Sequence, residues 1–420
     1  MAEMKDSGTA WLGMIPKDWE LSKISSIYEL RTQKVSDKDY PPLSVTMNRI
    51  VPQLDSAAKT NAHDDRKLVK KGDFAINSRS DRRGSCGVSE YDGSVSLINT
   101  VMKPRDEMNP DYYNWLFHTI QFADEFYKWG HGIVDDLWTT NWQDMKHIDI
   151  PVPTLDEQKV IADYLNKAIP EIDALHTDIE KQIETLEEYK KSIITEAVTK
   201  GLDPDVEMKD SGIELIGQIP NEWKISRLGW ISKKIGDGIH GTVTFEDGET
   251  NFYFINGNNI KKRNIAIKDN TQRITERIYN TYKTNLTTHT ILISLNGTIG
   301  NLAFYNNENV LLGKSVGFIE LKEEYNREYI YYLLQANYIK TIFELSFAGT
   351  TINNLSLQTL RKTNVLLPPK TEQKKIVKYL DKKCAEIDGA IEEKKEQLDT
   401  LEQYKKSVIY EYVTGKKEVQ

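Results

Sequence analysis

The strongest constraint on the fold is an internal repeat made of two separate blocks. Residues 4–24 (MKDSGTAWLGMIPKDWELSKI) match residues 208–228 (MKDSGIELIGQIPNEWKISRL) at ten of 21 positions, and residues 157–199 match residues 372–414 at 22 of 43 positions, both without a gap. The offset is 204 in the first block and 215 in the second, so the segment between the blocks is 11 residues longer in the second copy. Because sequence repeats reflect repeated structural units, we expect the same architecture twice.

Each copy consists of an opening motif, a variable domain and a helical segment. The helical blocks are alike, whereas the variable domains share only weak echoes, such as PDYYNWLF at 110–117 against REYIYYLL at 327–334. This contrast suggests that the two helices have the same function, whereas the two domains have related but different functions. The predicted segments are a first domain with its opening motif at 1–153, a helix at 154–200, a second opening motif and domain at 201–368, and a helix at 369–416.

The two helical segments carry apolar residues spaced alternately by four and three, which is typical of a heptad seam. Lys190 interrupts this seam in the first copy, and Lys394 and Lys405 interrupt it in the second. Each segment would be about 65 Å long at about 1.5 Å per residue, and the seam predicts that the two pair with each other. The residues predicted to form this pairing are Ile172, Ile179, Ile183, Leu186, Ile193, Ile387, Ile391, Leu398, Leu401 and Val408.

The start of the first helix has its own signals. Thr154 and Glu157 have the spacing of a capping box, whereas Pro369 stands at the corresponding place before the second helix, so this cap is not shared. Pro170 predicts a break between a short leading helix and the long one, because proline cannot donate the backbone hydrogen bond of a helix interior.

Two tyrosines suggest a further face on the helices. Tyr189 and Tyr404 stand in the repeated YKKS and lie off the strict seam. We interpret them as candidates for docking a partner. The alternative is a coiled coil that serves only as a spacer.

The variable domains are mixed in character. Short β-branched and aromatic runs, such as TILISL at 290–295 and NFYFI at 251–255, alternate with Gly and Asn turns, and helical stretches follow at 111–127 and 327–345. The predicted fold class is therefore α/β (α+β). Two globular domains, each with a twisted and mostly antiparallel sheet, would be separated by two long antiparallel helices that form a coiled coil, with a pseudo-two-fold internal repeat.

Charge is distributed unevenly along the chain. The 55 Lys and Arg against 63 Asp and Glu give a formal charge of −8, which argues against a protein that coats polyanions. Residues 224–366 nevertheless carry 17 basic and 12 acidic residues, and basic side chains cluster locally in both variable domains. Arginine beside Asn, Ser and Thr suits phosphate and base-edge contacts, although a solvated loop is the plainer interpretation of any single cluster.

Motifs of common catalysts are missing from the sequence. LLGKSVG at 311–317 lacks the leading glycine of a phosphate-binding loop, because Glu308 stands at that place. The two cysteines, Cys86 and Cys384, are far apart, and the seven histidines show no metal-ligand spacing. This excludes a disulfide framework and a structural zinc site and fits a reducing cytosol. We therefore predict no catalytic residues, no metal site and a cytoplasmic location.

At this point the sequence resembles a known family, the specificity subunits of type I restriction–modification systems. The resemblance covers nearly the whole chain. It is carried by the two opening motifs, by IPVPTLDEQKVIADYL at 150–165 and LLPPKTEQKKIVKYL at 366–380, by the helix ends KSIITEAVTKG and KSVIYEYVTGK, and by GDGIHGTVTF at 236–245 followed by FINGNNI at 254–260. The first domain lacks a GDGIHGT segment, so its target would belong to another class.

The resemblance implies a division of labour within a larger complex. Each variable domain would be a target-recognition domain that reads one half of a split sequence in double-stranded DNA, and the helices would set the spacer and dock two methyltransferase subunits. Those partners would use S-adenosylmethionine to modify adenine, and restriction and translocase subunits would use ATP and Mg²⁺ for cleavage. This chain would bind no cofactor and perform no catalysis itself.

The resemblance and the basic or amide-rich loops together suggest which residues contact DNA. Arginine can read guanine and asparagine can read adenine, although Asn and Thr in Gly-rich loops often only close turns. The candidates in the first domain are Asn77, Arg79, Arg82, Arg83, His131, Thr139 and Asn141. The candidates in the second domain are His240, Thr242, Asn258, Lys261, Arg263, Asn296, Thr350 and Asn353.

Two rival functions remain open from the sequence. One is an orphan scaffold built on a coiled coil, which binds protein and does not read DNA. The other is an enzyme in its own right. Duplicated domains with diverged loops fit the scaffold poorly, and the missing catalytic motifs argue against the enzyme.

Overall fold

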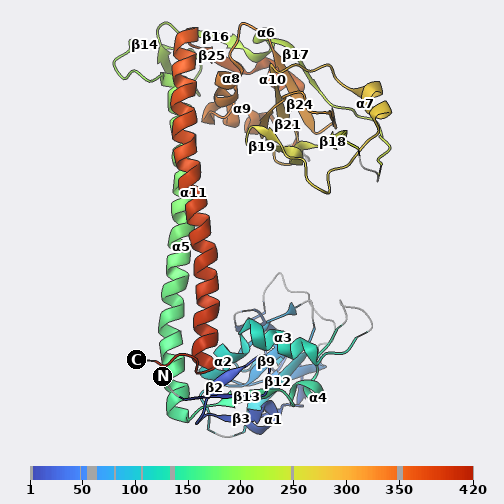
Figure 1. The fold of residues 1–420 in the computed structure, drawn as a ribbon, viewed down its shortest axis with the longest axis vertical. Coiled ribbons are helices and arrows are strands. Elements are labelled where there is room, and N and C mark those ends of the chain that lie inside the picture. Colours follow the sequence, from blue (N-terminus) through green and yellow to red (C-terminus); the bar gives the residue numbers. More distant parts are fainter. Residues whose placement is uncertain are drawn as a thin grey trace. The chain divides into compact units, whose positions relative to one another are not determined.

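A computed structural model describes residues 3–47, 49–53, 64–79, 82–105, 107–132, 138–246, 250–347 and 353–419. The chain forms two compact units, of which unit 1 comprises residues 1–180 and 395–420 and unit 2 comprises residues 181–394. Two long helices, α5 (Leu155–Lys200) and α11 (Lys370–Val413), contribute residues to both units (Figure 1). Each unit therefore contains one globular domain and a stretch of both long helices.

The globular part of unit 1 is a mixed domain in which short strands precede helices. Its elements are β1 (Met4–Asp6), β2 (Met14–Pro16), β3 (Glu20–Lys23), α1 (Ile24–Ile27), β4 (Tyr28–Leu30), β5 (Lys34–Val35), β6 (Leu43–Val45), β7 (Ile50–Pro52), β8 (Arg66–Val69), β9 (Phe74–Asn77), β10 (Cys86–Val88), β11 (Gly93–Val95), β12 (Asn99–Pro104), α2 (Pro110–Phe117), α3 (Ile120–Lys128), α4 (Trp142–Met145) and β13 (Asp149–Val152).

The globular part of unit 2 has a corresponding order. Its elements are β14 (Met208–Asp210), β15 (Gln218–Pro220), β16 (Lys224–Arg227), α6 (Leu228–Ile231), β17 (Ser232–Asp237), β18 (Tyr253–Ile255), η3 (Gly257–Asn259), β19 (Ile260–Lys261), β20 (Asn264–Ile265), α7 (Glu276–Tyr282), β21 (Thr290–Ser294), β22 (Leu302–Phe304), β23 (Val310–Leu312), β24 (Val316–Leu321), α8 (Arg327–Leu333), α9 (Asn337–Phe347), α10 (Leu357–Lys362) and β25 (Asn364–Leu367).

The central sheets of the two domains have the same topology. Unit 1 has the strand order β10-β9-β12-β4 and unit 2 the order β22-β21-β24-β17, with antiparallel pairing throughout both sheets. The flanking pairs β1-β2 and β3-β13 of unit 1 likewise correspond to β14-β15 and β16-β25 of unit 2. The predicted α/β fold class with mostly antiparallel sheets is confirmed, while β18 and β23 pair in parallel. The weakly similar variable domains thus share one fold.

Strand β21 shows why these domains are stable. Ile291 and Ile293 pack into one apolar cluster with helices α8 and α9, whereas Leu292 packs into a second cluster with Phe318. Alternate residues of a strand face opposite sides, so the sheet is buried on both faces. Its counterpart β9 does the same, because Phe74 and Ile76 join the main core of unit 1 and Ala75 joins a separate cluster.

The two long helices pack against each other as predicted, and within each unit they run antiparallel. In unit 1 the rings of Tyr164 and Tyr412 lie 4.3 Å apart, and Lys405 Nζ lies 2.6 Å from Asp173 Oδ1. In unit 2, Lys190 Nζ lies 2.6 Å from Asp388 Oδ2. By the offset of 215, Lys190 corresponds to Lys405 and Asp173 to Asp388. The two ion pairs are therefore one contact made once by each copy.

The three lysines that interrupt the seam make polar contacts between the two long helices. Lys190 and Lys405 make these ion pairs, and Lys394 donates to the side-chain oxygen of Gln182 on the other helix. Polar residues at seam positions fix the register of paired helices, because a slipped register would leave them unpaired. The predicted pairing residues that are buried in the structure are Ile172, Ile193, Ile387, Ile391 and Val408, and those that are half-buried are Ile179, Ile183, Leu186, Leu398 and Leu401.

One prediction about these helices is wrong and one is confirmed. Helix α5 continues from Leu155 to Lys200 with Pro170 inside it, so there is no break. Proline removes one backbone hydrogen bond, but its neighbours Ile169 and Ile172 are buried in the core of unit 1, and that packing holds the helix together. The capping box is present, since Thr154 N–H donates to Glu157 Oε2 at 2.8 Å and Glu157 N–H donates to Thr154 Oγ1 at 3.4 Å.

Candidate nucleic-acid interface

The candidates of the first domain gather where strand β9 ends. Asn77 closes β9 and accepts a hydrogen bond from the Arg79 N–H at 3.0 Å. Arg79 forms a β-bridge with Thr139, and Thr139 forms another with His131. The Tyr127 hydroxyl of α3 donates to the Arg79 carbonyl at 2.9 Å. The fold thus brings together residues that lie up to 62 positions apart in the sequence.

One arginine of this edge, Arg83, is oriented by α3. Arg83 forms an ion pair with Asp124, and its guanidinium lies 5.6 Å from the centre of the Tyr127 ring. Arg79 and Arg82 are exposed. We call Asn77, Arg79, Arg83, Tyr127, His131 and Thr139 the first edge cluster. Sequence reasoning missed Tyr127 and Asp124, because both lie in a helix with an apolar face and not in a polar loop.

Asn141 has a structural task beside this cluster. It is the N-cap of α4, where its side-chain oxygen accepts from the Gln143 N–H at 2.7 Å and the Asp144 carboxylate accepts from the Asn141 N–H at 3.0 Å. Asp144 also lies 3.1 Å from His131 Nε2, so the cap and the cluster are joined. Contact of Asn141 with DNA stays a prediction.

The candidates of the second domain gather around the end of β21, the strand that corresponds to β9. Asn296 follows β21 and bridges to Asn354. A Cβ atom on Gly257 would lie only 3.3 Å from the Asn296 carbonyl oxygen, so the turn that contains Asn258 packs closely against Asn296. His240 follows a bridge between Ile239 and Gly313, and its Nε2 lies 2.7 Å from Asp237 Oδ2.

Asn258 and Lys261 line one cavity of about 530 Å³ in unit 2. The rest of its lining is also rich in amide and hydroxyl groups, contributed by Asn256, Asn259, Asn270, Thr271, Gln272, Thr298 and Asn301 among others. Asn259 closes a turn, because its Oδ1 accepts from the Asn256 N–H at 3.0 Å, whereas Asn256 Oδ1 accepts from the distant Ser315 Oγ at 3.1 Å. We call His240, Asn258, Lys261 and Asn296 the second edge cluster.

Two further candidates of the second domain, Thr242 and Asn353, are not among the residues that make these contacts, although Asn353 precedes the bridging Asn354. Thr242 and Asn353 are both exposed. Thr350 lies outside the described residues. Their contact with DNA stays a prediction.

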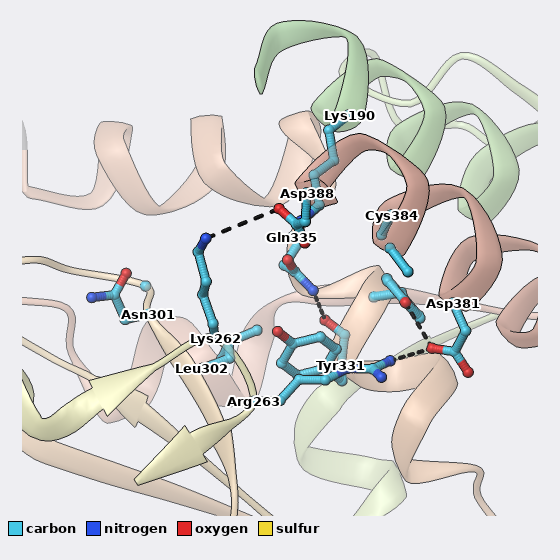
Figure 2. Close-up of a pocket in the computed structure, with 13 residues that line it drawn as sticks. Lys190, Lys262, Arg263, Asn301, Leu302, Tyr331, Gln335, Asp381, Cys384 and Asp388 are labelled. Carbon is cyan, nitrogen blue, oxygen red and sulfur yellow. Dashed lines mark hydrogen bonds and ion pairs between the residues drawn. The ribbon is translucent and has the colours of Figure 1, made fainter. Parts of the chain in front are cut away.

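Arg263 is placed differently from its neighbour Lys261. Its guanidinium lies 2.6 Å from Asp381 Oδ1 on α11, and its side chain is only 35% exposed (Figure 2). It lines another cavity, of about 300 Å³, together with Lys190, Tyr331 and Asp388. Burial lowers the pKa of Arg263, but the ion pair with Asp381 outweighs it and raises that pKa overall. The guanidinium is therefore held as a cation against the long helix.

An indole–carboxylate hydrogen bond anchors each opening motif to a long helix. Trp19 Nε1 donates to Glu157 on α5 and Trp223 Nε1 donates to Glu372 on α11, both at 3.0 Å. Burial tends to raise both carboxyl pKa values, but bonds from Thr154 and Trp19 lower the pKa of Glu157 overall, whereas the pKa of Glu372 is raised. Pro369 contributes to this difference, since it stands where Thr154 does and offers neither a hydroxyl nor an N–H. The carboxylates of Glu222 and Asp203 also raise the pKa of Glu372.

The two tyrosines proposed for docking are both exposed. Tyr189 is 55% exposed and Tyr404 is 52% exposed, as expected for residues off the seam. Among the described residues, three or more His, Cys, Asp or Glu side chains nowhere come together as a metal-binding group. No helix in the described ranges is long and apolar enough to cross a membrane.

Comparison with known proteins assigns these paired domains to a class. The family described as type I restriction modification DNA specificity domain matches twice, at residues 16–185 and 220–403. The chain therefore belongs to the family of type I restriction–modification DNA-specificity proteins and carries two copies of its domain. This agrees with the resemblance seen in the opening motifs and helix ends.

Individual relatives match over most of their length. The type I restriction enzyme MjaVIII specificity subunit of Methanocaldococcus jannaschii is 26% identical over 426 residues, covering 96% of this chain and 93% of the relative. The StySPI specificity subunit of Salmonella potsdam is 24% identical and covers 90% of this chain and 84% of the relative.

Solved structures show the same fold. A chain from a structure of the type I R-M system aligns with a TM-score of 0.72 at 15% identity, covering 96% of this chain and 99% of that one. The HsdS subunit from Thermoanaerobacter tengcongensis aligns with a TM-score of 0.52 at 18% identity, covering 96% and 98%. The paired domains and long helices are thus the shared architecture of these proteins.

Proposed function

We propose that this chain reads a two-part sequence in double-stranded DNA, with one half read by each domain. The observation that carries the proposal is that both edge clusters lie at the ends of equivalent strands, β9 and β21, yet are built from different residues. Equivalent positions with different side chains suit two readers of the same kind that recognise different bases.

The long helices hold the two readers at a set spacing in this proposal. Their register is locked by the equivalent ion pairs Lys405–Asp173 and Lys190–Asp388. The exposed Tyr189 and Tyr404 would each receive one methyltransferase subunit, since the repeat presents the same YKKS sequence twice. Restriction and translocase subunits would join this assembly in the cytoplasm. The S-adenosylmethionine, ATP and Mg²⁺ would be used by those partners, and the chain itself would catalyse nothing.

The test is methylation mapping of a host that expresses the chain with its methyltransferase partner. We expect methylated adenines within one two-part motif of constant spacer. Arg79→Ala combined with Arg82→Ala should relax the bases of one half only, and Lys261→Ala should weaken the other half. A good base contact contributes about 1–3 kcal/mol of discrimination, so relaxation of about tenfold or more is expected at the affected bases.

The control is Lys17→Ala, which removes an exposed cation of unit 1 that pairs with Glu3 outside the first edge cluster. It should leave both halves intact. An uninterrupted motif, or none, would support the scaffold instead. The purified chain incubated with DNA, Mg²⁺ and S-adenosylmethionine should neither cut nor methylate, and turnover there would contradict the division of labour.

A further inference from the structure

A strained hairpin tip in unit 2 directs Arg263 toward the long helix. Strands β19 and β20 form a two-residue hairpin whose central residues are Lys262, with φ of 37°, and Arg263, with φ of 72°. Two-residue hairpins need positive φ at their centre, which Asn and Gly adopt readily and long side chains do not. Residues held in such conformations point to a constraint imposed by their surroundings.

The surroundings of Arg263 supply that constraint. Its guanidinium carbon lies 5.0, 5.1 and 5.7 Å from the ring centres of Tyr332, Tyr331 and Phe304. Its nitrogen donates to Asp381 Oδ1, which also accepts from the Tyr332 hydroxyl at 2.8 Å. A planar guanidinium stacked on aromatic rings and paired with a carboxylate is a geometry that lysine does not reproduce. The cage therefore selects arginine.

The neighbouring Lys262 makes a second link to the same helix. Lys262 Nζ lies 4.0 Å from Asp388 Oδ1, and Asp388 pairs with Lys190 of α5 (Figure 2). Asp381 and Asp388 are seven residues apart, so they lie two turns apart on one face of α11. The hairpin tip thus contacts α11 at Asp388, the same residue whose ion pair with Lys190 fixes the register of the two long helices.

The corresponding joint in unit 1 is centred on Asn166, whose side-chain nitrogen donates to Asp111 Oδ2 at 3.1 Å. By the offset of 215, Asn166 corresponds to Asp381, and there the Trp115 Nε1 donates to the Asn166 side-chain oxygen at 2.9 Å. An aromatic donor of the domain meets the long helix in both units. Only the second copy has an aspartate at this position, paired with an arginine.

We propose that Arg263 and Asp381 form a clamp that fixes the pose of the second recognition domain on α11 and thereby restricts which spacer lengths the protein accepts. Arg263 is then a positioning residue and does not read bases. The clamp rests on the proposed function, because a spacer exists only for a two-part site. The clamp affects which spacer length is accepted, whereas the two edge clusters determine which bases are recognised.

The test uses the full chain in complex with its methyltransferase partner. The substrates are duplexes with both half-sites constant and the spacer varied one base pair at a time. Wild type should methylate one spacer strongly. Arg263→Ala and Asp381→Asn should each raise methylation of the neighbouring spacers relative to the preferred one by about tenfold, since charge-assisted hydrogen bonds are among the stronger ones. Arg263→Lys should restore part of the stringency.

Lys233→Ala is the matched control. It breaks an exposed ion pair with Glu323 in the same unit, outside the clamp, so it should retain the spacer profile of wild type. Tyr332→Phe removes one hydroxyl from Asp381 and should cause a smaller shift in the same direction. All variants should keep the base preferences of both halves.

Three results would overturn the clamp. Unchanged spacer profiles in both Arg263→Ala and Asp381→Asn would show that the joint does not control spacing. Altered base preference in Arg263→Ala with a normal profile in Asp381→Asn would make Arg263 a base-reading residue. If the wild-type chain itself showed no two-part site, both the proposed function and the clamp would be overturned. The measurement on wild type alone distinguishes that failure from the other two.

Discussion

The two units attach their domains to the long helices through equivalent positions with different chemistry. Both use a tryptophan that donates to a glutamate at the start of a long helix. In unit 1 Thr154 also donates to that glutamate, and farther along the helix Asn166 bonds to Trp115 and Asp111. In unit 2 a proline replaces the threonine, and an ion pair between Arg263 and Asp381 replaces the asparagine contacts. Equivalent backbones therefore tolerate different polar networks, provided that each buried polar group has a partner.

The largest expected effect comes from removing the anchoring tryptophans. Trp223 is 1% exposed and Trp19 is 4% exposed. Trp223→Ala and Trp19→Ala should each lower the free energy of unfolding by about 3–5 kcal/mol, because a large buried side chain is replaced by a cavity. Hydrogen exchange read by mass spectrometry should show faster exchange mainly in the unit that carries the substitution. Equal acceleration in both units would contradict the division into two compact units.

The interhelical ion pairs allow a finer comparison. Lys190 is 23% exposed and Lys405 is 28% exposed, while their partners Asp388 and Asp173 are 40% and 55% exposed. Double-mutant cycles with alanine should give coupling energies of about 0.5–1 kcal/mol, with the pair in unit 2 the stronger because less water screens it. The measurement is urea unfolding of the four chains of each cycle. A stronger pair in unit 1 would be the contrary result.

The smallest expected effect is on the acidity of the two anchoring glutamates. Thr154→Val should raise the pKa of Glu157, since it removes one donor, and Pro369→Thr should lower the pKa of Glu372 by providing one. Carboxyl carbon NMR titration of wild type and both variants measures this. Shifts in the same direction for both variants would refute the explanation by the cap.

These pKa directions also set opposite pH dependences. Glu157 has a folded-state pKa below its ordinary 4.5, so its contribution to stability is present above that value and is lost as pH falls through the lower folded-state pKa. Glu372 has a folded-state pKa above 4.5, so its contribution is present below 4.5 and is lost as pH rises through the higher pKa. Acidification from pH 7 should therefore weaken the anchor of unit 1 relative to that of unit 2.

Much of the fold follows from local patterns in the sequence. The repeat predicted two equivalent units, the spacing of four and three predicted paired helices, and Thr154 with Glu157 predicted a cap, because periodicity and capping act within a few residues. Pro170 is the exception. Its local preference for a break is overridden by the burial of Ile169 and Ile172, which depends on partners distant in the sequence.

The site is predictable to a smaller degree, for a physical reason visible in Lys261 and Arg263. Both belong to one basic run, so the sequence treats them alike and suggests phosphate or base contacts for each. The tertiary structure separates them, since the hairpin leaves Lys261 at an amide-lined cavity and directs Arg263 to Asp381, 118 residues away. Composition and periodicity determined the units, the sheets and the helix pair, whereas the partner of each charged side chain was decided only when distant segments packed together.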